Sequence, residues 1–386
     1  MTTYPQKKLI MLPGPVDVPE KTLAALLKPV ISHRGEEFRE LYSHIEEMAK
    51  KVFQTNSKIF VLTASGTGGV EAAVLNLVRP GDKIVVPIFG EFGHRLAKQI
   101  ERAGGNVITV EAPMGTAPDI EKIKEAFEFN EDIKALFTIY NDTSPGTTYR
   151  FLKEAAAIAK DKGAFVAVDA ISILGGDELP QDNWAIDVVI AGSQKCIAMP
   201  PGLVLVSASE RVLEYVRNNP PITTYFDFAK QEDFLVKKNE TPFTPAIPLF
   251  YALEVALGEV LKEGLEERVR KHRVAAKAFY QALSYVGLEP FVEEKFRSNV
   301  VITAKYREGM DDKKFREVLN KKFDVVIGGG FGELKGKIFR IGNMGDIRVA
   351  KVFRTLSAIG NAMNLMGIEA DTKGMLKVAE EELQTL

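Results

Sequence analysis

The sequence predicts an α/β protein with a mostly parallel sheet, followed by a smaller α+β unit. From about residue 57 to residue 210, short apolar runs alternate with helical patterns. Gly, Pro, Asp or Asn bounds each run, and the runs have the character of strands that are buried on both faces. Such strands, separated by helices, are typical of a parallel sheet that carries helices on both sides.

Seven strands are expected in this first part of the chain. They cover residues 58–63, 83–87, 107–111, 135–140, 164–169, 187–191 and 203–207, with helices over 69–78 and 93–103 after the first two. A long helical pattern over 264–286, closed by Gly287, leads into the smaller unit. Strands near 298–304 and 337–341 are expected there.

Composition excludes several classes of function. The 386 residues include 50 Lys and Arg and 52 Asp and Glu, so a formal net charge of -2 leaves no basic surface for nucleic acid or for a membrane. No segment approaches the roughly 20 apolar residues of a membrane span. Because Cys196 is the single cysteine and the four histidines lack ligand spacing, no disulfide or metal site is expected. We expect a cytoplasmic protein whose partners are small molecules and a second copy of itself.

Polar loops follow five of the expected strands. They begin at Ala64, Ile88, Tyr140, Asp169 and Gly192. Ligands of parallel α/β sheets bind at the carboxyl ends of the strands, so these loops are expected to converge on one site.

Lys195 and Asp169 are the residues of these loops with the most specific chemistry. A lysine amine can condense with the aldehyde of pyridoxal 5′-phosphate (PLP), and a carboxylate can pair with its pyridinium nitrogen. Burying an acid at the end of an apolar strand is costly unless the acid is paired. We therefore expect a PLP site in which Lys195 forms the resting Schiff base and later moves the substrate proton. Alternatively, Lys195 lies in a surface loop and Asp169 caps a helix.

The Gly-rich turn that contains Thr67, Gly68 and Gly69 follows a strand and opens a helix. Glycines let the backbone approach a phosphate, and a helix N-terminus offers unpaired N–H groups. The turn matches neither the dinucleotide pattern nor the P-loop pattern, because Glu71 occupies the last glycine position and Gly-Lys-Ser/Thr is absent. A purely structural role for these glycines remains open.

Four further features are candidates for contacts with the ligand. Phe89 follows a strand and would stack on a pyridine ring or pack under its own loop. The loop from Tyr140 to Gly146 would offer a hydroxyl to the ligand or be a plain turn. Arg340 interrupts an apolar strand with a fork that suits a carboxylate, or it is an ion-paired surface residue. The turn from Thr241 to Pro245 would cap a helix or reach a phosphate.

Taken in order, these motifs resemble the class V branch of fold-type I PLP enzymes, specifically the alanine/serine–glyoxylate (serine–pyruvate) aminotransferases. The resemblance spans nearly the whole chain. It rests on residues 11–15, His33-Arg34, residues 52–55, 65–68 and 168–172, Gly192-Ser193-Gln194-Lys195, and residues 339–342.

The resemblance implies a role for each candidate residue. Thr67, the amides of Gly68 and Gly69, and Gln194 would hold the cofactor phosphate. Phe89 and Ile171 would lie on the two ring faces, and Ser144 would face the phenolic oxygen. Asp169 would pair with the ring nitrogen, Lys195 would carry the cofactor, and Arg340 would bind the substrate carboxylate. Thr241 and Thr244 would reach the phosphate from the second subunit of a homodimer, and the Gly14 loop would close over the substrate.

It also implies the domain organisation. Residues 1–16 would pack on the small domain at the entrance of the site. Residues 17–270 would form the large PLP-binding domain with a mostly parallel seven-stranded sheet, and residues 271–386 would form the small α+β domain.

The activity implied is ping-pong transfer of the amino group of L-alanine or L-serine to glyoxylate or pyruvate. Phe89, Tyr140, Asp142, Pro145 and Thr241 depart from the commonest family pattern, so the donor stays open, and aspartate is an alternative. Desulfuration is disfavoured because Cys196 lies beside Lys195. A PLP-dependent lyase and a regulatory protein without activity are the remaining alternatives.

Overall fold

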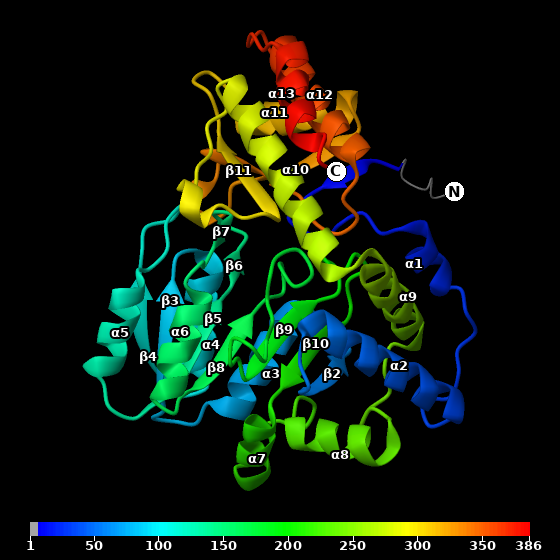
Figure 1. Cartoon of the computed structure of the whole chain (residues 1–386), viewed down its shortest axis with the longest axis vertical. Coiled ribbons are helices and arrows are strands. Elements are labelled where there is room, and N and C mark those ends of the chain that lie inside the picture. The colour runs from blue at the N-terminus through cyan, green and yellow to red at the C-terminus, as the bar shows by residue number, and fades with distance from the viewer. Residues whose placement is uncertain (1–6) are drawn as a thin grey trace.

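The computed structural model describes residues 7–386, and its larger domain is built on a seven-stranded sheet (Figure 1). The strand order is β2-β10-β9-β8-β5-β3-β4, and only β10 runs antiparallel to its neighbours. The bounds are β2 Lys58–Leu62, β3 Lys83–Ile88, β4 Asn106–Glu111, β5 Ile133–Ile139, β8 Phe165–Asp169, β9 Val188–Gly192 and β10 Val204–Ala208. The expected α/β class, with seven strands, is confirmed.

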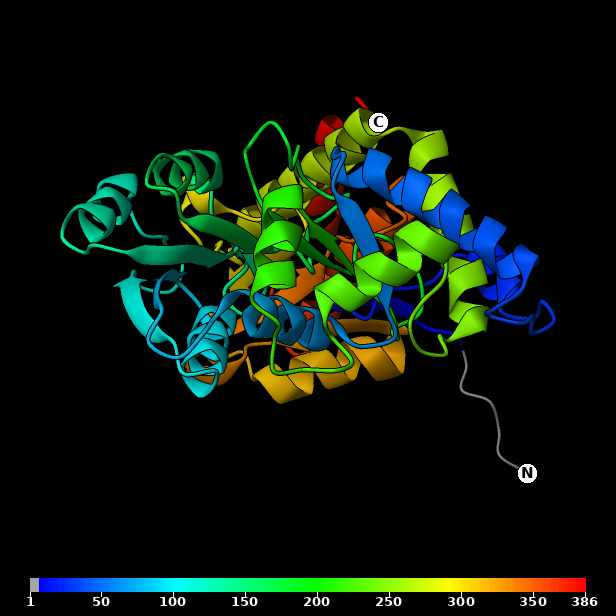
Figure 2. The same ribbon diagram turned by 90° about the horizontal axis from the view of Figure 1, so that it is seen from below.

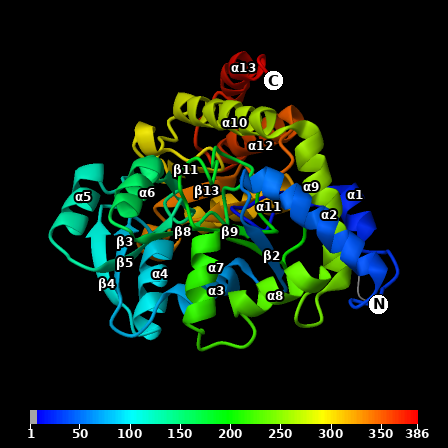
Figure 3. The same cartoon turned by 60° about the horizontal axis from the view of Figure 1, so that its bottom comes forward.

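Helices cover both faces of this sheet. Helix α3 (Gly66–Leu77) joins β2 to β3, and α4 (Glu91–Arg102) joins β3 to β4. Both connections move across the sheet toward β4, so right-handed crossovers place the two helices on the same face. From β4 the chain crosses the sheet in the opposite direction, to β5 and then to β8. The helices of these two connections, α5 (Ile120–Glu128) and α6 (Leu152–Asp161), therefore lie on the other face (Figure 3). The remaining helices of this domain are α1 Glu20–Ala25, α2 Glu36–Phe53, α7 Glu210–Asn218, α8 Phe228–Lys238 and α9 Ile247–Glu263.

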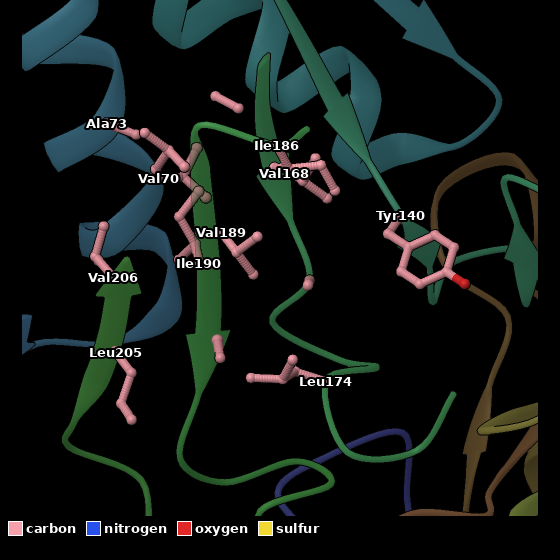
Figure 4. Packing of buried hydrophobic residues seen from close by; sticks show 14 of the residues in the cluster. Val70, Ala73, Tyr140, Val168, Leu174, Ile186, Val189, Ile190, Leu205 and Val206 are labelled. Atoms are coloured by element: carbon pink, nitrogen blue, oxygen red, sulfur yellow. The ribbon is translucent and has the colours of Figure 1, made fainter. Parts of the chain in front are cut away.

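The core lies between α3 and the central strands. Val70 and Ala73 of α3 are buried against Ile190 of β9 and its neighbour β10, as Figure 4 shows. The helix can approach this closely because residue 69 is glycine. A Cβ at Gly69 would lie 2.5 Å from Val204 and 2.7 Å from Ile190, well inside van der Waals contact. Close helix–sheet packing therefore explains this glycine.

The smaller domain contains a four-stranded sheet in the order β1-β12-β13-β11. Its strands are β1 Leu9–Met11, β11 Val301–Lys305, β12 Val325–Gly329 and β13 Ile338–Gly342. Helices α11 Asp312–Lys322, α12 Val349–Leu365 and α13 Thr372–Leu383 complete the domain, with short 3-10 turns at Glu294–Phe296 and Gly332–Leu334. The sequence predicted β11 and β13 but not β1 or β12.

A single long helix connects the two sheets. Helix α10 (Leu265–Tyr285) begins beside α9 and extends onto the small domain, where it packs against α12 and α13. Seen from below, the large domain lies in front of the small one (Figure 2). Strand β1 pairs in parallel with β12 and forms one edge of the small sheet. Residues 1–6, part of the expected N-terminal segment, lie outside the described residues. No helix within residues 7–386 has the length and apolar character that crossing a bilayer requires.

Candidate active site

A cavity of about 170 Å³ opens at the carboxyl ends of β5, β8 and β9. Both Lys195 and Asp169 line it. The other lining residues are Ser65, Gly66, Thr67, Val70, Phe92, Arg95, Leu96, Gln99, Ile139, Asn141, Thr143, Ile171, Ser172 and Gln194. Parallel strands end at one edge of the sheet, so residues far apart in sequence meet here.

Lys195 lies in the loop that follows β9. Its amine donates a hydrogen bond to the carbonyl of Pro13, next to Gly14, whose φ of +92° lets the chain pass close to the lysine. Burial lowers the pKa of the Lys195 amine to about 8. The Asp169 carboxylate raises this pKa and the Arg340 cation lowers it, so burial decides the direction. About a tenth of the amine is therefore uncharged at pH 7, far more than for an exposed lysine.

Asp169 is the last residue of β8. One carboxylate oxygen accepts a hydrogen bond of 2.9 Å from the backbone amide of Ile171. Burial raises the pKa of the carboxyl group to about 7, and the negative charge of Asp142 acts in the same direction. A cation placed against Asp169 would reverse this shift, so the carboxylate is suited to pair with a positively charged ligand group.

The N-terminus of α3 forms one end of the cavity. Gly66 and Thr67 line it, whereas the amides of Gly68 and Gly69 donate to the Ser65 carbonyl at 2.9 and 3.3 Å. Gly68 and Gly69 therefore do not line the cavity, contrary to the expectation. The amides available to an anion are those of Gly66 and Thr67, the first two residues of α3, which have no partner within the helix.

The structure does not support the expected ring contact of Phe89. Its side chain is 1 % exposed and stacks on Tyr149 with ring centroids 5.7 Å apart, outside the cavity. Phe92, in the first turn of α4, lines the cavity instead, together with Ile171. The strand continues to Ile88, and the residue after it turns into the core, so the exposed aromatic position comes three residues later.

The loop after β5 also differs from the expectation. Ser144 donates to Asp142 and accepts from the Glu91 amide at 2.9 Å, so its hydroxyl is engaged away from the ligand. Asp142 is fully buried and accepts from the amides of Phe92 and Gly93 at the start of α4. Tyr140 donates to the Glu178 carbonyl at 2.8 Å. The residues of this loop that line the cavity are Asn141 and Thr143.

Arg340 lies on β13 and extends toward the same loop. Its Nε donates to the Gly329 carbonyl at 2.7 Å and its Nη1 donates to the Thr143 carbonyl at 2.9 Å. Within residues 7–386, Nη2 has no hydrogen-bond partner. Burial lowers the pKa of the guanidinium, and the Asp142 charge opposes this shift. The fork is held in place by two carbonyls, one of them on Thr143, which lines the cavity; Arg340 itself is not among the lining residues.

Thr241 and Thr244 do not line the cavity of their own chain. The Thr241 hydroxyl donates to the Phe243 carbonyl at 2.7 Å, and Thr244 is exposed. The expected contact of these threonines is with the cofactor phosphate of a second subunit, and it stays a prediction.

Some cavity residues were missed in the sequence. Phe92, Arg95, Leu96 and Gln99 recur at the spacing of one helix face. This spacing marks the side of the helix that faces the ligand, and it is visible in the sequence. Asn141 and Thr143 alternate along an extended segment, which is a weaker signal within a turn-rich loop.

The residues present fit a phosphorylated pyridine aldehyde. Gln194 lines the cavity, and its buried Oε1 has no hydrogen-bond partner within the described chain. Its amide group Nε2 carries two N–H donors, the kind of group that phosphate oxygens accept from. At Gly66, a Cβ would lie 2.7 Å from Ile171 and would narrow the cavity. A lysine, a carboxylate, a helix N-terminus and two apolar side chains complete the set that PLP requires.

Fold and site together define a PLP-type aminotransferase scaffold, and comparison with known proteins agrees. A family model described as aminotransferase class-V matches residues 21–333. The chain belongs to the class-V aminotransferases.

Relatives of this family match over nearly the full length. An uncharacterized aminotransferase of Methanocaldococcus jannaschii is 39% identical over 378 residues, which cover 98% of each chain. The alanine–glyoxylate aminotransferase of Drosophila melanogaster is 34% identical and covers 95% of this chain and 96% of its own. The crystal structure of the ureidoglycine–glyoxylate aminotransferase of Bacillus subtilis is 30% identical, covers 100% of both chains and superposes with a TM-score of 0.93. The expected resemblance and the fold-type I architecture are thus confirmed.

Proposed function

We propose that the protein is a PLP-dependent aminotransferase that transfers the amino group of L-alanine or L-serine to glyoxylate or pyruvate. The observation that carries this proposal is the meeting of Lys195 and Asp169 in one cavity at the carboxyl ends of β8 and β9. Relatives that are named for transfer to glyoxylate support it.

Several residues would hold the cofactor. The amides of Gly66 and Thr67, the Thr67 hydroxyl and Gln194 would bind the phosphate at the start of α3. Phe92 and Ile171 would enclose the ring, and Asp169 would pair with the protonated ring nitrogen. When bound, PLP supplies an aldehyde that joins the substrate amine and a ring that withdraws electrons from Cα.

Lys195 would act first as the attachment point and then as the base. Its pKa of about 8 leaves Nζ partly uncharged, so Nζ can take the proton from the substrate Cα. An arginine could not replace it, because a guanidinium stays protonated. Pro13 and Gly14 lie against the Lys195 side chain and would exclude water from the amine.

Arg340 would bind the substrate carboxylate through Nη2. Amino acids and 2-oxo acids both carry this group, so one cation would position the donor and the acceptor in turn. A site shared in this way predicts ping-pong kinetics, in which the first product leaves before the second substrate binds.

The complete site would require a homodimer. Thr244 is exposed on its own subunit, at the end of a loop that carries two threonines. We propose that Thr241 and Thr244 reach the cofactor phosphate of the other subunit.

One observation favours aspartate as a second candidate donor. Arg95 lines the cavity, its guanidinium lies over the Phe92 ring at 4.7 Å, and no ion pair within residues 7–386 involves it. An unpaired cation in the cavity would suit a second carboxylate.

A donor-by-acceptor panel on the purified protein tests the assignment. Alanine, serine and aspartate would be combined with glyoxylate, pyruvate and 2-oxoglutarate, and both the keto acid and ammonia would be measured. Transfer from alanine or serine to glyoxylate or pyruvate is expected. Ammonia release without an acceptor would show a lyase instead. The Lys195→Ala variant should remain dimeric and lose turnover by about 10²- to 10⁴-fold or more, the range of a lost proton-transfer group.

A further inference from the structure

The loop between α8 and α9 is held by two arginines from the beginning of the large domain. This loop runs over residues 239–246 and carries Thr241 and Thr244. Helices α2, α8 and α9 lie at the same end of the molecule (Figure 3). Because the threonines of this loop are proposed to act on another subunit, the contacts that fix the shape of the loop matter for that subunit's site.

Glu240 is the centre of the contact. It is 2 % exposed, which is unusual for a carboxylate, and it lies at the start of the loop. Arg34 Nη1 donates to one of its oxygens at 2.8 Å. Arg39 donates to the other oxygen through Nε at 3.0 Å and Nη2 at 2.8 Å. Both carboxylate oxygens are therefore paired with a cation.

Arg34 also binds the loop backbone directly. Its Nη1 donates to the Thr241 carbonyl at 2.5 Å, and its Nη2 donates to the Pro242 carbonyl at 3.0 Å. One planar guanidinium thus fixes a side chain and two successive peptide groups. A lysine has a single ammonium centre and could not hold all three acceptors in this geometry.

The rest of the loop is fixed from the other side. The rings of Phe243 and Tyr225 stack with centroids 5.2 Å apart. The Ala246 amide donates to Thr63 Oγ1 at 3.1 Å. Thr244 lies between these two contacts and remains exposed. The arginines therefore order the start of the loop, while its end is ordered independently of them.

We propose that Arg34 and Arg39, acting through Glu240, are positioning residues that present Thr241 and Thr244 to the cofactor phosphate bound in a second copy of the chain. The inference rests on the proposed function, because it requires PLP and a dimer. It goes further in assigning a role to Arg34, whose side-chain hydrogen-bond partners Glu240, Thr241 and Pro242 do not line the cavity of their own chain. The arginines of one subunit thus control phosphate binding in the other.

The first experiment compares Arg34→Met with Arg34→Lys, and uses Arg217→Met as a matched control. Arg217 also forms ion pairs with two acids, Glu210 and Glu232, but on the exposed α7 and α8 surface. The fraction of chains that carry cofactor on Lys195 is measured by intact mass after borohydride reduction, over a range of PLP concentrations. Light scattering gives the oligomeric state.

We expect Arg34→Met to stay dimeric and to need about 10- to 100-fold more PLP for half-labelling, the range seen when partners that orient ligand-binding groups are lost at metal sites. Arg34→Lys should fall between this variant and the wild type, and Arg217→Met should match the wild type. Half-labelling by pyridoxal, which lacks the phosphate, should be unchanged in all variants. An unchanged PLP requirement, an equal loss with pyridoxal, or a monomeric Arg34→Met protein would each overturn the proposal.

A mixed dimer tests whether the effect crosses the interface. Arg34→Met and Lys195→Ala chains with different affinity tags are co-expressed and purified over both tags. In this dimer, the single lysine-bearing site belongs to the Arg34→Met chain and receives its loop from a chain with both arginines intact. We expect that site to label at the wild-type PLP concentration. Persistent weak labelling would show that Arg34 acts within its own subunit. Absence of Lys195 labelling in the wild type would instead contradict the proposed function.

Discussion

The Asp142 carboxylate accepts a hydrogen bond of 2.9 Å from the backbone amide of Phe92. Asp142, one of the departures from the family pattern, is therefore buried beneath the first turn of α4, where it holds the backbone of the aromatic residue that lines the cavity. Burial raises the pKa of Asp142, while hydrogen bonds from Ser144 and from the amides of Gly93 and Phe92 oppose the shift. The residue acts on the site through the helix it caps.

Phe92 and Phe89 should respond differently to the same substitution. Phe92→Leu should weaken PLP binding, because a flat surface beside the ring is lost, while leaving stability within about 1 kcal/mol. Phe89→Leu should destabilise the fold by about 1 to 2 kcal/mol, because a fully buried ring is replaced, with little change in PLP binding. Equilibrium dialysis and urea unfolding measure the two effects. The reverse pattern would restore the original assignment of Phe89.

Lys195 should react with aldehydes at a lower pH than an ordinary lysine. In the cofactor-free protein, its reductive methylation should reach half its maximal rate near pH 8, because burial disfavours the charged amine. Arg340→Met removes a nearby cation and should move this midpoint to higher pH. Mass spectrometry of the Lys195 peptide gives the rate, with peptides from exposed lysines of the same digest as the control. A midpoint near pH 10.5 would contradict the buried environment.

Asp169 should make the cofactor-free protein less stable as pH rises. The pKa of Asp169 is about 7 in the folded chain, against the ordinary aspartate value of 3.8. Between these values the native state retains a proton that the unfolded chain has released, so the free energy of unfolding falls from about pH 4 to pH 7. Asp169→Asn removes this loss and should gain up to about 4 kcal/mol over wild type by pH 7.5, because each unit of pKa difference corresponds to about 1.4 kcal/mol.

Urea unfolding at pH 4.5 and pH 7.5, at equal protein concentrations, measures the Asp169 effect. The advantage of the asparagine variant should be small at the lower pH and should grow toward the higher one. An advantage that does not depend on pH would show that the carboxyl group is not desolvated. The same variant should bind PLP more weakly, since the partner of the ring nitrogen is lost.

Arg340→Met should raise KM for every amino-acid and 2-oxo-acid substrate by about 10- to 100-fold. A hydrogen bond to a charged group contributes about 1.5 to 3 kcal/mol, which corresponds to this range. PLP binding should change little, because the guanidinium contacts Thr143 and Gly329 rather than the phosphate end. Steady-state kinetics with at least two donors measures the effect. An unchanged KM would exclude Arg340 from carboxylate binding.

The sequence predicted the large sheet and the principal chemistry correctly for a physical reason. Buried strands have continuous apolar runs, and lysine or aspartate at their ends is conspicuous against that background. The orientation of residues after a strand is harder to predict, because one step along the chain reverses the direction of a side chain. Phe89 and Ser144 point away from the cavity for this reason, while Phe92 and Thr143 line it.

Two strands escaped prediction because their partners are remote or their pattern is short. β1 is only three residues long and pairs with β12, which contains two consecutive glycines, Gly328 and Gly329. Glycines are depleted in strands, so β12 lacks the usual signal. The arginine contacts of Glu240 were also invisible, because they join residues far apart in sequence.

The pairing of β1 with β12 has a consequence for biosynthesis. Leu9 leaves the ribosome long before its partner Val325 is made. Strand β1 must therefore remain without its neighbour while the chain between them is synthesised, and contacts of such high sequence separation form slowly. Because the following residues Pro13 and Gly14 lie against Lys195, the reactive lysine should stay uncovered in the nascent chain until the C-terminal part has folded.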